Sequence, residues 1–385
     1  MFQFEKALVG SRKYWIWMAF LLVVILVGFL AYLREEEIGL AVTALSRDVV
    51  WGLYIAQFVF CVGLGASAVV VVVPYYLHDW RAFSKITLLG EMLGMCSVIL
   101  AMLFILVSMG QPQRVFNVLL YPHPNSLIFW DLLVLSGYVL LNAVITVTLL
   151  NAESQEIAPP KWIKPIIVLS IPWAVSIHIV TAFLLSGLAA RSFWMTPLLA
   201  PRFLASAFAS GPALLILLLL LLRRLKVFDA PKEAIQKLAL IVTYCVLINL
   251  FFVGVELFTV FYSQIPEPLE HYRYLFFGLN GHAPLAAPMW ISMLLSVASV
   301  LLLLVPTWRA NLRLLSLACA FVFASIWLEK GLGLVTGGFT PSPLGAVTPY
   351  VPNLAEWTVA IGIWALGALM ITGLYKIAIS VREVH

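Results

Sequence analysis

The chain has 385 residues, of which 63% are hydrophobic and only 11% are charged, and its mean hydropathy is +1.04. Soluble domains contain about a quarter charged residues and roughly half apolar ones, so this composition excludes a protein whose main solvent is water. The formal net charge of +5 does not indicate nucleic-acid binding, because the basic residues stand singly or in pairs between long apolar runs. That pattern is typical of charges that orient membrane helices.

Ten apolar stretches are long enough to cross a bilayer. A crossing helix needs about 20 mostly apolar residues, because backbone groups without hydrogen bonds in lipid cost several kcal/mol each. The first stretch ends in Tyr32-Leu33-Arg34-Glu35 rather than in a small-residue cleavage site, so it is a helix and not a signal peptide. The sequence predicts one all-α polytopic membrane domain over residues 1–385, with helices near 14–33, 50–77, 86–109, 127–150, 163–187, 202–222, 236–262, 285–305, 312–335 and 354–379.

The distribution of Lys and Arg predicts the orientation of the chain. An even number of spans places both termini on one side, and only seven of the 23 basic residues fall on the other side. The positive-inside rule therefore predicts cytoplasmic termini in a multi-pass protein of the cytoplasmic (inner) membrane. The seven residues on the opposite, outer side are Arg34, Arg47, Arg114, Arg191, Arg202, Arg273 and Lys330.

Helix order suggests how the spans pack and where a partner could dock. The second to fifth and the sixth to ninth helices can form two four-helix bundles, with the first and tenth helices as additions. The long connections all lie on the outer side and are rich in Pro, Gly and aromatic residues. They are either a docking surface for a partner or simple caps of the helix ends, and they span 110–126, 188–201, 263–284 and 336–353.

Ionisable side chains inside the predicted spans are candidate functional groups, because each costs about 2.5 to 3.5 kcal/mol to insert. Most of them fall in the outer half of the membrane, His178 lies near mid-depth, and Glu91 lies in the inner half. This asymmetry predicts a polar site that opens toward the outer leaflet. The outer-half residues are Gln57, Asp131, Arg202, Glu256, Glu329, Lys330 and Glu356.

Each of these residues also has a structural interpretation. His178 is either a ligand or proton-transfer group, or a packing histidine bonded to a neighbouring helix. Glu329 and Lys330 point about 100° apart on a helix, so we expect them to pair with other helices, in a proton path or in a structural salt bridge. Glu356 is close enough to the surface to be simply solvated, and Glu91 is a candidate for proton entry from the inner side.

The sequence argues against a resident redox cofactor. A membrane haem usually needs two histidines at matching depth, whereas only His178 lies well inside a span. The four cysteines, at positions 61, 96, 245 and 319, form no CxxC pair, so iron–sulfur or zinc ligation is not expected. A quinone that diffuses in the membrane fits better, because its carbonyls need hydrogen-bond donors and its reduction needs protons.

Several motifs resemble the NrfD-like polysulfide-reductase membrane-anchor family. They are Trp51-Gly52-x-Tyr54-x-x-Gln57, the stretch from His178-x-x-Thr181 through Ala190-Arg191-x-Phe193-Trp194 to Pro201-Arg202-Phe203, and Glu329-Lys330-Gly331 followed by Gly338-Phe339-x-Pro341. The similarity covers nearly the whole chain. Within the family, it is strongest to the ten-helix DsrP-type subunits of transmembrane complexes associated with sulfite reduction.

The resemblance implies a membrane subunit of a quinone-linked oxidoreductase complex, without a bound redox cofactor of its own. It would exchange electrons between menaquinone and a ferredoxin-like iron–sulfur partner on the outer loops, beside other membrane and cytochrome subunits, in sulfite or sulfate metabolism. A secondary transporter and a purely structural anchor are the alternatives. The expected quinone contacts lie in a pocket of the second, fourth and fifth helices and are Gln57, Asp131, His178 and Tyr54. The candidates for a proton path are Glu91, Glu256, Glu329 and Lys330. Two arginines, Arg191 and Arg202, would hold helix ends or a partner.

Overall fold

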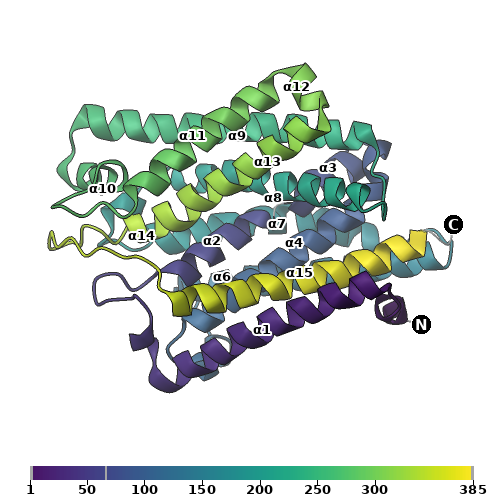
Figure 1. Cartoon of the computed structure of the whole chain (residues 1–385), viewed down its shortest axis with the longest axis horizontal. Helices are drawn as coiled ribbons and strands as arrows, with labels where there is room; N and C mark the ends of the chain where they lie inside the picture. Colours follow the sequence, from purple (N-terminus) through teal and green to yellow (C-terminus); the bar gives the residue numbers. More distant parts are fainter. Residues whose placement is uncertain (1–2, 66, 383–385) are drawn as a thin grey trace.

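A computed structural model describes residues 3–65 and 67–382, which form an all-helical bundle with ten helical stretches long and apolar enough to cross a membrane (Figure 1). The predicted all-helical class and the predicted number of spans are confirmed. The long helices are α1 (Arg12–Ile38), α2 (Leu53–Leu64) continued by α3 (Ser67–Tyr76), α4 (Ser84–Ser108), α6 (Leu127–Ser154), α7 (Ile163–Ser186), α8 (Leu199–Arg224), α9 (Lys232–Ser263), α11 (Ala286–Leu304), α13 (Leu312–Ile326) with its continuation, and α15 (Leu354–Arg382).

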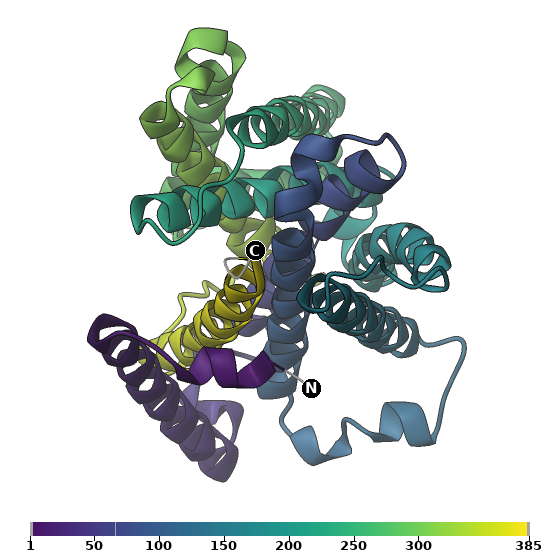
Figure 2. The ribbon, with the colours of Figure 1, turned by 90° about the vertical axis from the view of Figure 1, so that its right-hand side faces the viewer.

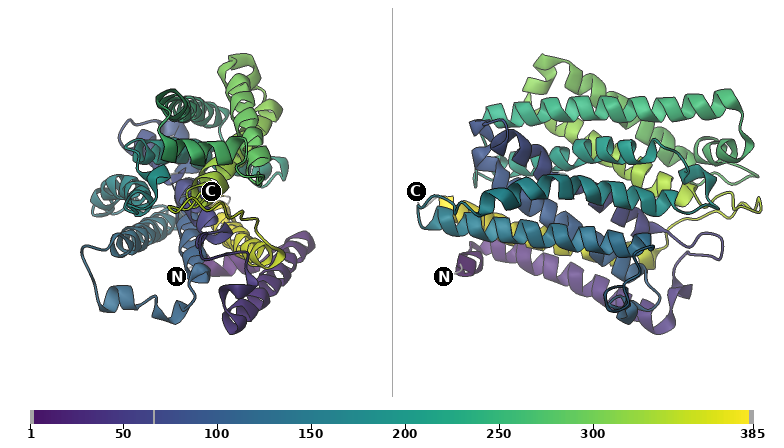
Figure 3. Two further views of the ribbon diagram at one scale, coloured as in Figure 1. Left: turned by 90° about the vertical axis from the view of Figure 1, so that its left-hand side faces the viewer. Right: turned by 180° about the vertical axis from the view of Figure 1, so that it is seen from behind.

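Both ends of the chain lie at one end of the bundle, which we call the terminal end (Figures 1 and 3). The long connections lie at the opposite end, called here the distal end. This arrangement follows from an even number of crossings. The short helices α5 (Asn117–Leu120), α10 (Pro266–Phe276) and α14 (Leu334–Gly337) belong to the distal end, whereas α12 (Pro306–Ala310) belongs to the terminal end.

The long helices pack as two groups and a pair. One group contains α2–α3, α4, α6 and α7, and the other contains α8, α9, α11 and α13. Helix α8 joins the groups, since it packs against α2, α3 and α7 as well as α9 and α13. Helices α1 and α15 run side by side, with α15 between α1 and the rest of the bundle (Figure 2). Their contact depends on glycine, because a Cβ on Gly28 would lie 2.6 Å from the Gly362 Cα.

Helix α2–α3 is the centre of the fold. In the most apolar stretch of 18 residues, 94% of the α2–α3 residues are buried inside the bundle, whereas the corresponding share for α1 is 11%. Gly65 ends the α2 part, and the Tyr138 hydroxyl on α6 donates to the Gly65 carbonyl at 2.8 Å. A carbonyl freed inside lipid must find such a donor. Close crossings also explain the small residues here, because a Cβ on Gly211 of α8 would lie 2.8 Å from the Ser67 backbone nitrogen.

Two features of the distal half differ from the sequence prediction. The ninth span does not continue as a regular helix, because Trp327–Gly333 form a π-helix, η6, between α13 and α14. Such wide turns are often found at functional sites. The connection 263–284, predicted only as a long segment between two spans, contains helix α10. That helix begins at Pro266, and its residues His271 and Tyr272 are buried against the bundle.

Candidate functional site

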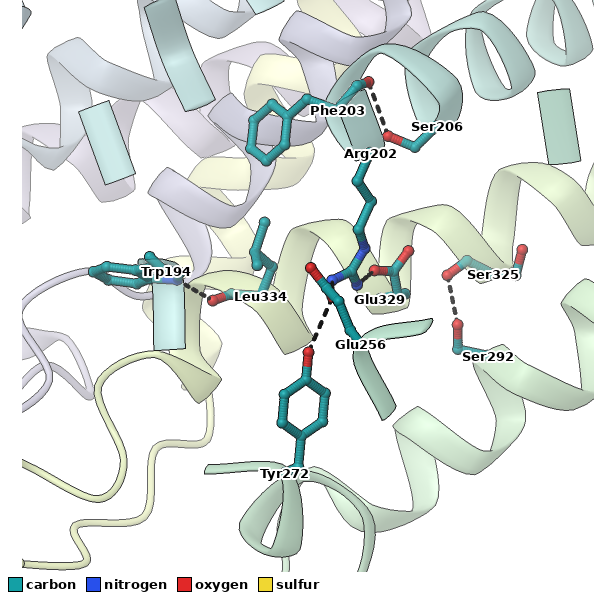
Figure 4. Close-up of polar contacts among 10 residues, drawn as sticks. All are labelled: Trp194, Arg202, Phe203, Ser206, Glu256, Tyr272, Ser292, Ser325, Glu329 and Leu334. Atoms are coloured by element: carbon teal, nitrogen blue, oxygen red, sulfur yellow. Dashed lines mark hydrogen bonds and ion pairs between the residues drawn. The ribbon is translucent and has the colours of Figure 1, made fainter. Parts of the chain in front are cut away.

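A buried network of charges joins three elements of the distal half. Arg202, in the first turn of α8, forms ion pairs with Glu256 of α9 and Glu329 of η6 (Figure 4). The Tyr272 hydroxyl of α10 donates to Glu256 Oε2 at 3.0 Å. The planar guanidinium suits this arrangement, because it presents several N–H donors in a fixed fork. The prediction that Glu329 pairs with another helix is therefore confirmed.

Lys330 completes the charge balance beside this network. Its ammonium group donates to the Phe203 carbonyl at 3.2 Å and lies 4.2 Å from the centre of the Phe203 ring. Both contacts are to α8, and the side chain is only 2% exposed. The two cations Arg202 and Lys330 thus match the two carboxylates Glu256 and Glu329 in formal charge, and Arg202 makes the ion pairs with both carboxylates. Buried charges of opposite sign in equal number are what a low-dielectric interior requires.

A second polar line runs between α6 and α7. The Thr181 hydroxyl donates to Asp131 Oδ1 at 2.8 Å, with Asp131 only 2% exposed. One turn away along α7, His178 is fully buried and packs edge-on against Phe208 of α8. Within residues 3–65 and 67–382, neither ring nitrogen of His178 has a hydrogen-bond partner. His178 therefore keeps unused hydrogen-bonding capacity inside the bundle.

Gln57 lies in a different place from the one expected. Its side chain faces α13, η6 and α15, because Gln57 Oε1 accepts from both Trp327 Nε1 and Trp364 Nε1 at 3.0 Å. The predicted pocket of the second, fourth and fifth helices is thus not formed around Gln57, which is turned toward the ninth and tenth spans. A groove of about 230 Å³ opens here, lined by Gln57, Phe323, Trp327, Trp357, Ala360, Ile361 and Trp364.

The two tryptophans also determine how the Gln57 amide is oriented. An indole N–H is only a donor, so the amide atom that meets both indoles must be the oxygen. The amide nitrogen then points elsewhere and keeps its two donor hydrogens. Gln57 itself is 1% exposed, whereas Ile361 at the edge of the groove is 53% exposed, so the groove reaches the lipid-facing surface. We call it the Gln57 groove.

Two buried carboxylates lie on the distal side of this groove. Glu35 Oε2 of α1 accepts from the Tyr54 hydroxyl at 2.6 Å, and Glu356 Oε1 accepts from the Tyr350 hydroxyl at 2.5 Å. The prediction that Glu356 is simply solvated is wrong, because it is 1% exposed. The backbone N–H groups of Ala44 and Asn353 also donate to its second oxygen. Glu356 thus fastens two distal loops to α15.

Glu91 is the buried carboxylate of the opposite half. It lies on α4, 1% exposed, and in the described part of the chain neither of its oxygens has a hydrogen-bond partner. Thr87, one turn closer to the terminal end, lines a cleft of about 200 Å³ together with Tyr75, Tyr76 and Glu153. Glu91 therefore lies one turn of α4 beyond a residue that lines this cleft.

The distal loops are held to the bundle by polar contacts of their own. Arg191 lies over the Phe339 ring at 4.5 Å and donates to the Phe339 carbonyl at 3.3 Å. His271 Nδ1 is 2.9 Å from the Gly337 carbonyl and 3.0 Å from that of Thr340, so this nitrogen carries the proton. Burial lowers the pKa of His271, which keeps the ring neutral. Arg191 thus holds loop structure within this chain.

The structure therefore divides the predicted residues into separate groups. Arg202, Glu256, Glu329 and Lys330 form one network, Asp131 and His178 lie along the α6–α7 line, and Gln57 lines its own groove. Sequence reasoning missed several partners because each pairing joins segments far apart in the chain. The missed residues are Glu35, Tyr272, Trp327, Tyr350 and Trp364.

Among residues 3–65 and 67–382, no group of three or more His, Cys, Asp and Glu side chains forms a candidate metal site.

Fold and site together define the class of protein. It is an integral, multi-pass membrane protein that buries its ionisable groups inside the bundle, most of them toward one end. The profile of the family described as polysulphide reductase, NrfD, matches residues 41–340. The chain belongs to this family, as its motifs indicated. Helices α1 and α15 lie outside the matched residues.

Three curated proteins illustrate the range of similar chains. A Halobacterium salinarum protein described as a membrane subunit of dimethyl sulfoxide reductase is 25% identical, over 92% of this chain and 89% of its own length. A selenate reductase subunit of Mesobacillus selenatarsenatis is 23% identical, over 88% of both chains. The Hdr-like menaquinol oxidoreductase integral membrane subunit of Archaeoglobus fulgidus is 24% identical, over 94% of this chain and 93% of its own.

Proposed function

We propose that this chain is the membrane subunit of a respiratory electron-transfer complex and that it exchanges electrons between a menaquinone-type quinone and an iron–sulfur partner. Family membership supports this, and so do the relatives' names, one of which is a menaquinol oxidoreductase subunit. The observation that carries the proposal is the Gln57 groove. It combines a buried amide with an aromatic lining and an opening to the lipid-facing surface.

The groove suits a quinone head group chemically. A quinone carbonyl is only an acceptor, and the Gln57 amide nitrogen is a donor because the two indoles fix the amide oxygen. Flat aromatic side chains favour offset stacking on a flat ring, and Trp357 and Phe323 line the groove. An isoprenoid tail would remain in the lipid. Tyr54, one turn from Gln57 on α2, is the second proposed quinone contact.

The other buried groups receive different roles in this proposal. Asp131 and His178 are assigned to proton transfer rather than to the quinone ring, because they lie along α6 and α7 and His178 has unused ring nitrogens. Glu91 is the proposed entry point on the terminal side. Glu256, Glu329 and Lys330 were candidates for the same path. Their pairing with α8 favours the structural alternative, in which they hold α8, α9 and η6 together within one group of helices.

The biological setting is also proposed. The bias of Lys and Arg supports cytoplasmic termini in the inner membrane. In this proposal the distal loops, and a ferredoxin-like iron–sulfur subunit bound to them, lie on the outer side. Other membrane and cytochrome subunits would complete the complex. Resemblance to DsrP-type subunits supports a role in sulfite or sulfate respiration.

A direct binding experiment tests the quinone assignment. Menadione titrated into the purified chain in nanodiscs is expected to quench tryptophan fluorescence saturably, because three tryptophans line the groove. The control is 2-methylnaphthalene, which has the same ring system without carbonyls and should quench weakly and without saturation. Equal quenching by both compounds would contradict a site that recognises carbonyl groups. Solute counterflow in vesicles that contain only this chain would instead favour a secondary transporter.

A further inference from the structure

Glu35 stands out among the carboxylates of the bundle. It lies one turn before the end of α1 and is 2% exposed, whereas its neighbours Arg34, Glu36 and Glu37 are exposed. Its Oε2 accepts from the Tyr54 hydroxyl at 2.6 Å. Its Oε1 is buried and has no hydrogen-bond partner among residues 3–65 and 67–382. Burial of such a group inside a span is costly, which makes it a candidate for function.

Comparison with Glu356 separates a structural carboxylate from one with spare capacity. Both oxygens of Glu356 are used, by the Tyr350 hydroxyl and by the backbone N–H groups of Ala44 and Asn353. Glu35 uses only one oxygen, and its partner is a hydroxyl that can itself pass on a proton. Glu356 is thus bound into loop structure, while Glu35 keeps one oxygen without a hydrogen bond in the described part of the chain.

Tyr54 and Glu35 lie on the distal side of the Gln57 groove. Tyr54 and Gln57 are three residues apart on α2 and hence share a face of that helix. On α15, Glu356 directly precedes Trp357, which lines the groove. Glu35 lies about 4.5 Å along the helix axis from the last residue of α1. The pair therefore lies between the groove and the distal end.

The titratable groups around Glu35 come from three elements. Tyr54 contacts it from α2, Glu356 acts on it electrostatically from α15, and Tyr32 lies on its own helix. Tyr350 acts on Tyr54 from the loop before α15. Each of these groups is neutral or anionic, so within the part of the chain that the structure describes no buried cation is paired with Glu35. That environment suits a group that takes up a proton and releases it.

We infer that Glu35 and Tyr54 form the proton-exchange pair of the quinone site, an inference that rests on the function proposed above. Oxidation of a quinol to its quinone breaks two O–H bonds and releases two electrons and two protons. The electrons pass to the iron–sulfur partner. In each proton transfer, the Tyr54 oxygen accepts a proton from the quinol while the Tyr54 hydroxyl proton moves to Glu35 Oε2. Glu35 then releases that proton to water at the distal end. The pair works twice in each turnover, and reduction of the quinone reverses every step.

Two substitutions in the purified complex test the pair. With menadiol as donor and an artificial electron acceptor, the wild-type rate is expected to rise with pH and then level off, because Glu35 must be deprotonated to accept. Glu35→Gln and Tyr54→Phe should each lower the plateau rate about 100-fold, the lower end of the range for a positioned proton-transfer group, and flatten the rise with pH. Glu36→Gln, which removes an exposed charge next door, should change neither.

Menadione binding distinguishes this inference from the proposed function. In Glu35→Gln, saturable tryptophan quenching should persist although turnover is lost, because the Gln57 groove is intact. A wild-type rate and pH profile in both Glu35→Gln and Tyr54→Phe would overturn the proton-exchange pair and leave the quinone site standing. Absence of saturable quenching in the wild-type chain would instead refute the quinone site, and the pair with it.

Discussion

Replacing Gln57 by methionine is expected to weaken menadione binding about 100-fold and to abolish quinone-linked turnover of the complex. The change removes the amide donor for a quinone carbonyl and leaves two indole N–H groups without their acceptor. A buried polar group left unpaired costs about 1 to 3 kcal/mol. For the quinone carbonyl that loses its donor, the upper part of this range corresponds to the expected loss of affinity. Menadione titration followed by tryptophan fluorescence measures the affinity, and menadiol oxidation measures turnover.

Two further variants make this result specific. Gln57→Glu keeps an oxygen for both indoles but replaces the two amide donors by at most one carboxyl O–H, so it should lose affinity, and the buried acid should also cost some stability. Asn142 is a matched control, because it is a buried amide on α6 whose nitrogen donates to the Tyr138 carbonyl and it does not line the groove. Asn142→Leu should bind menadione normally. Normal binding by Gln57→Met would remove the main support for the groove as the quinone site.

Replacing Arg202 by alanine is expected to destabilise the chain by about 3 to 5 kcal/mol, the range for removal of one partner of a buried ion pair. Glu256 and Glu329 would remain buried as carboxylates without their cation. The contacts between α8, α9 and η6 should loosen, and the thermal midpoint in detergent should fall sharply. Arg202→Lys should recover only part of the loss, because a lysine cannot reproduce the fork of the guanidinium.

A charge-matched variant separates electrostatics from packing at Arg202. Arg202→Met combined with Glu256→Gln, Glu329→Gln and Lys330→Met removes all four buried charges together and should recover much of the stability, because no uncompensated charge remains. The exposed pair between Arg81 and Asp79 serves as a surface control, and its removal should change the midpoint little. Equal midpoints for Arg202→Ala and the quadruple variant would contradict the electrostatic explanation.

Much of the fold was predictable because lipid imposes a simple rule on backbone hydrogen bonds. Length and hydropathy alone located ten spans, and the even number of spans placed both termini together. Helix α10 was not predicted, because its eleven residues contain Glu267, Glu270 and Arg273 and carry no long apolar run. The π-helix η6 also left no signal, since it depends on packing around Trp327 and Glu329 and not on local propensity.

The site was predictable in part, for a different physical reason. The cost of burying a charge marked Arg202, Glu256, Glu329 and Lys330 as residues that need partners, but the partners lie on helices far apart in sequence. Glu356 was misjudged because its depth near a helix end suggested water, whereas two loops fold over it. Gln57 was expected to be a quinone contact, and the structure turns it toward the ninth and tenth spans because tertiary packing decides which way its helix faces.

The most direct test of the central claim is to locate a bound quinone on this chain. An azido-naphthoquinone photolinked to the complex in native membranes, followed by peptide mapping, should label the residues around the Gln57 groove, on α2, on α13 with η6 and on α15. Excess menadione should suppress the label. Specific labelling confined to α6 and α7, around Asp131 and His178, would contradict the account and return the quinone to the helices first expected to hold it.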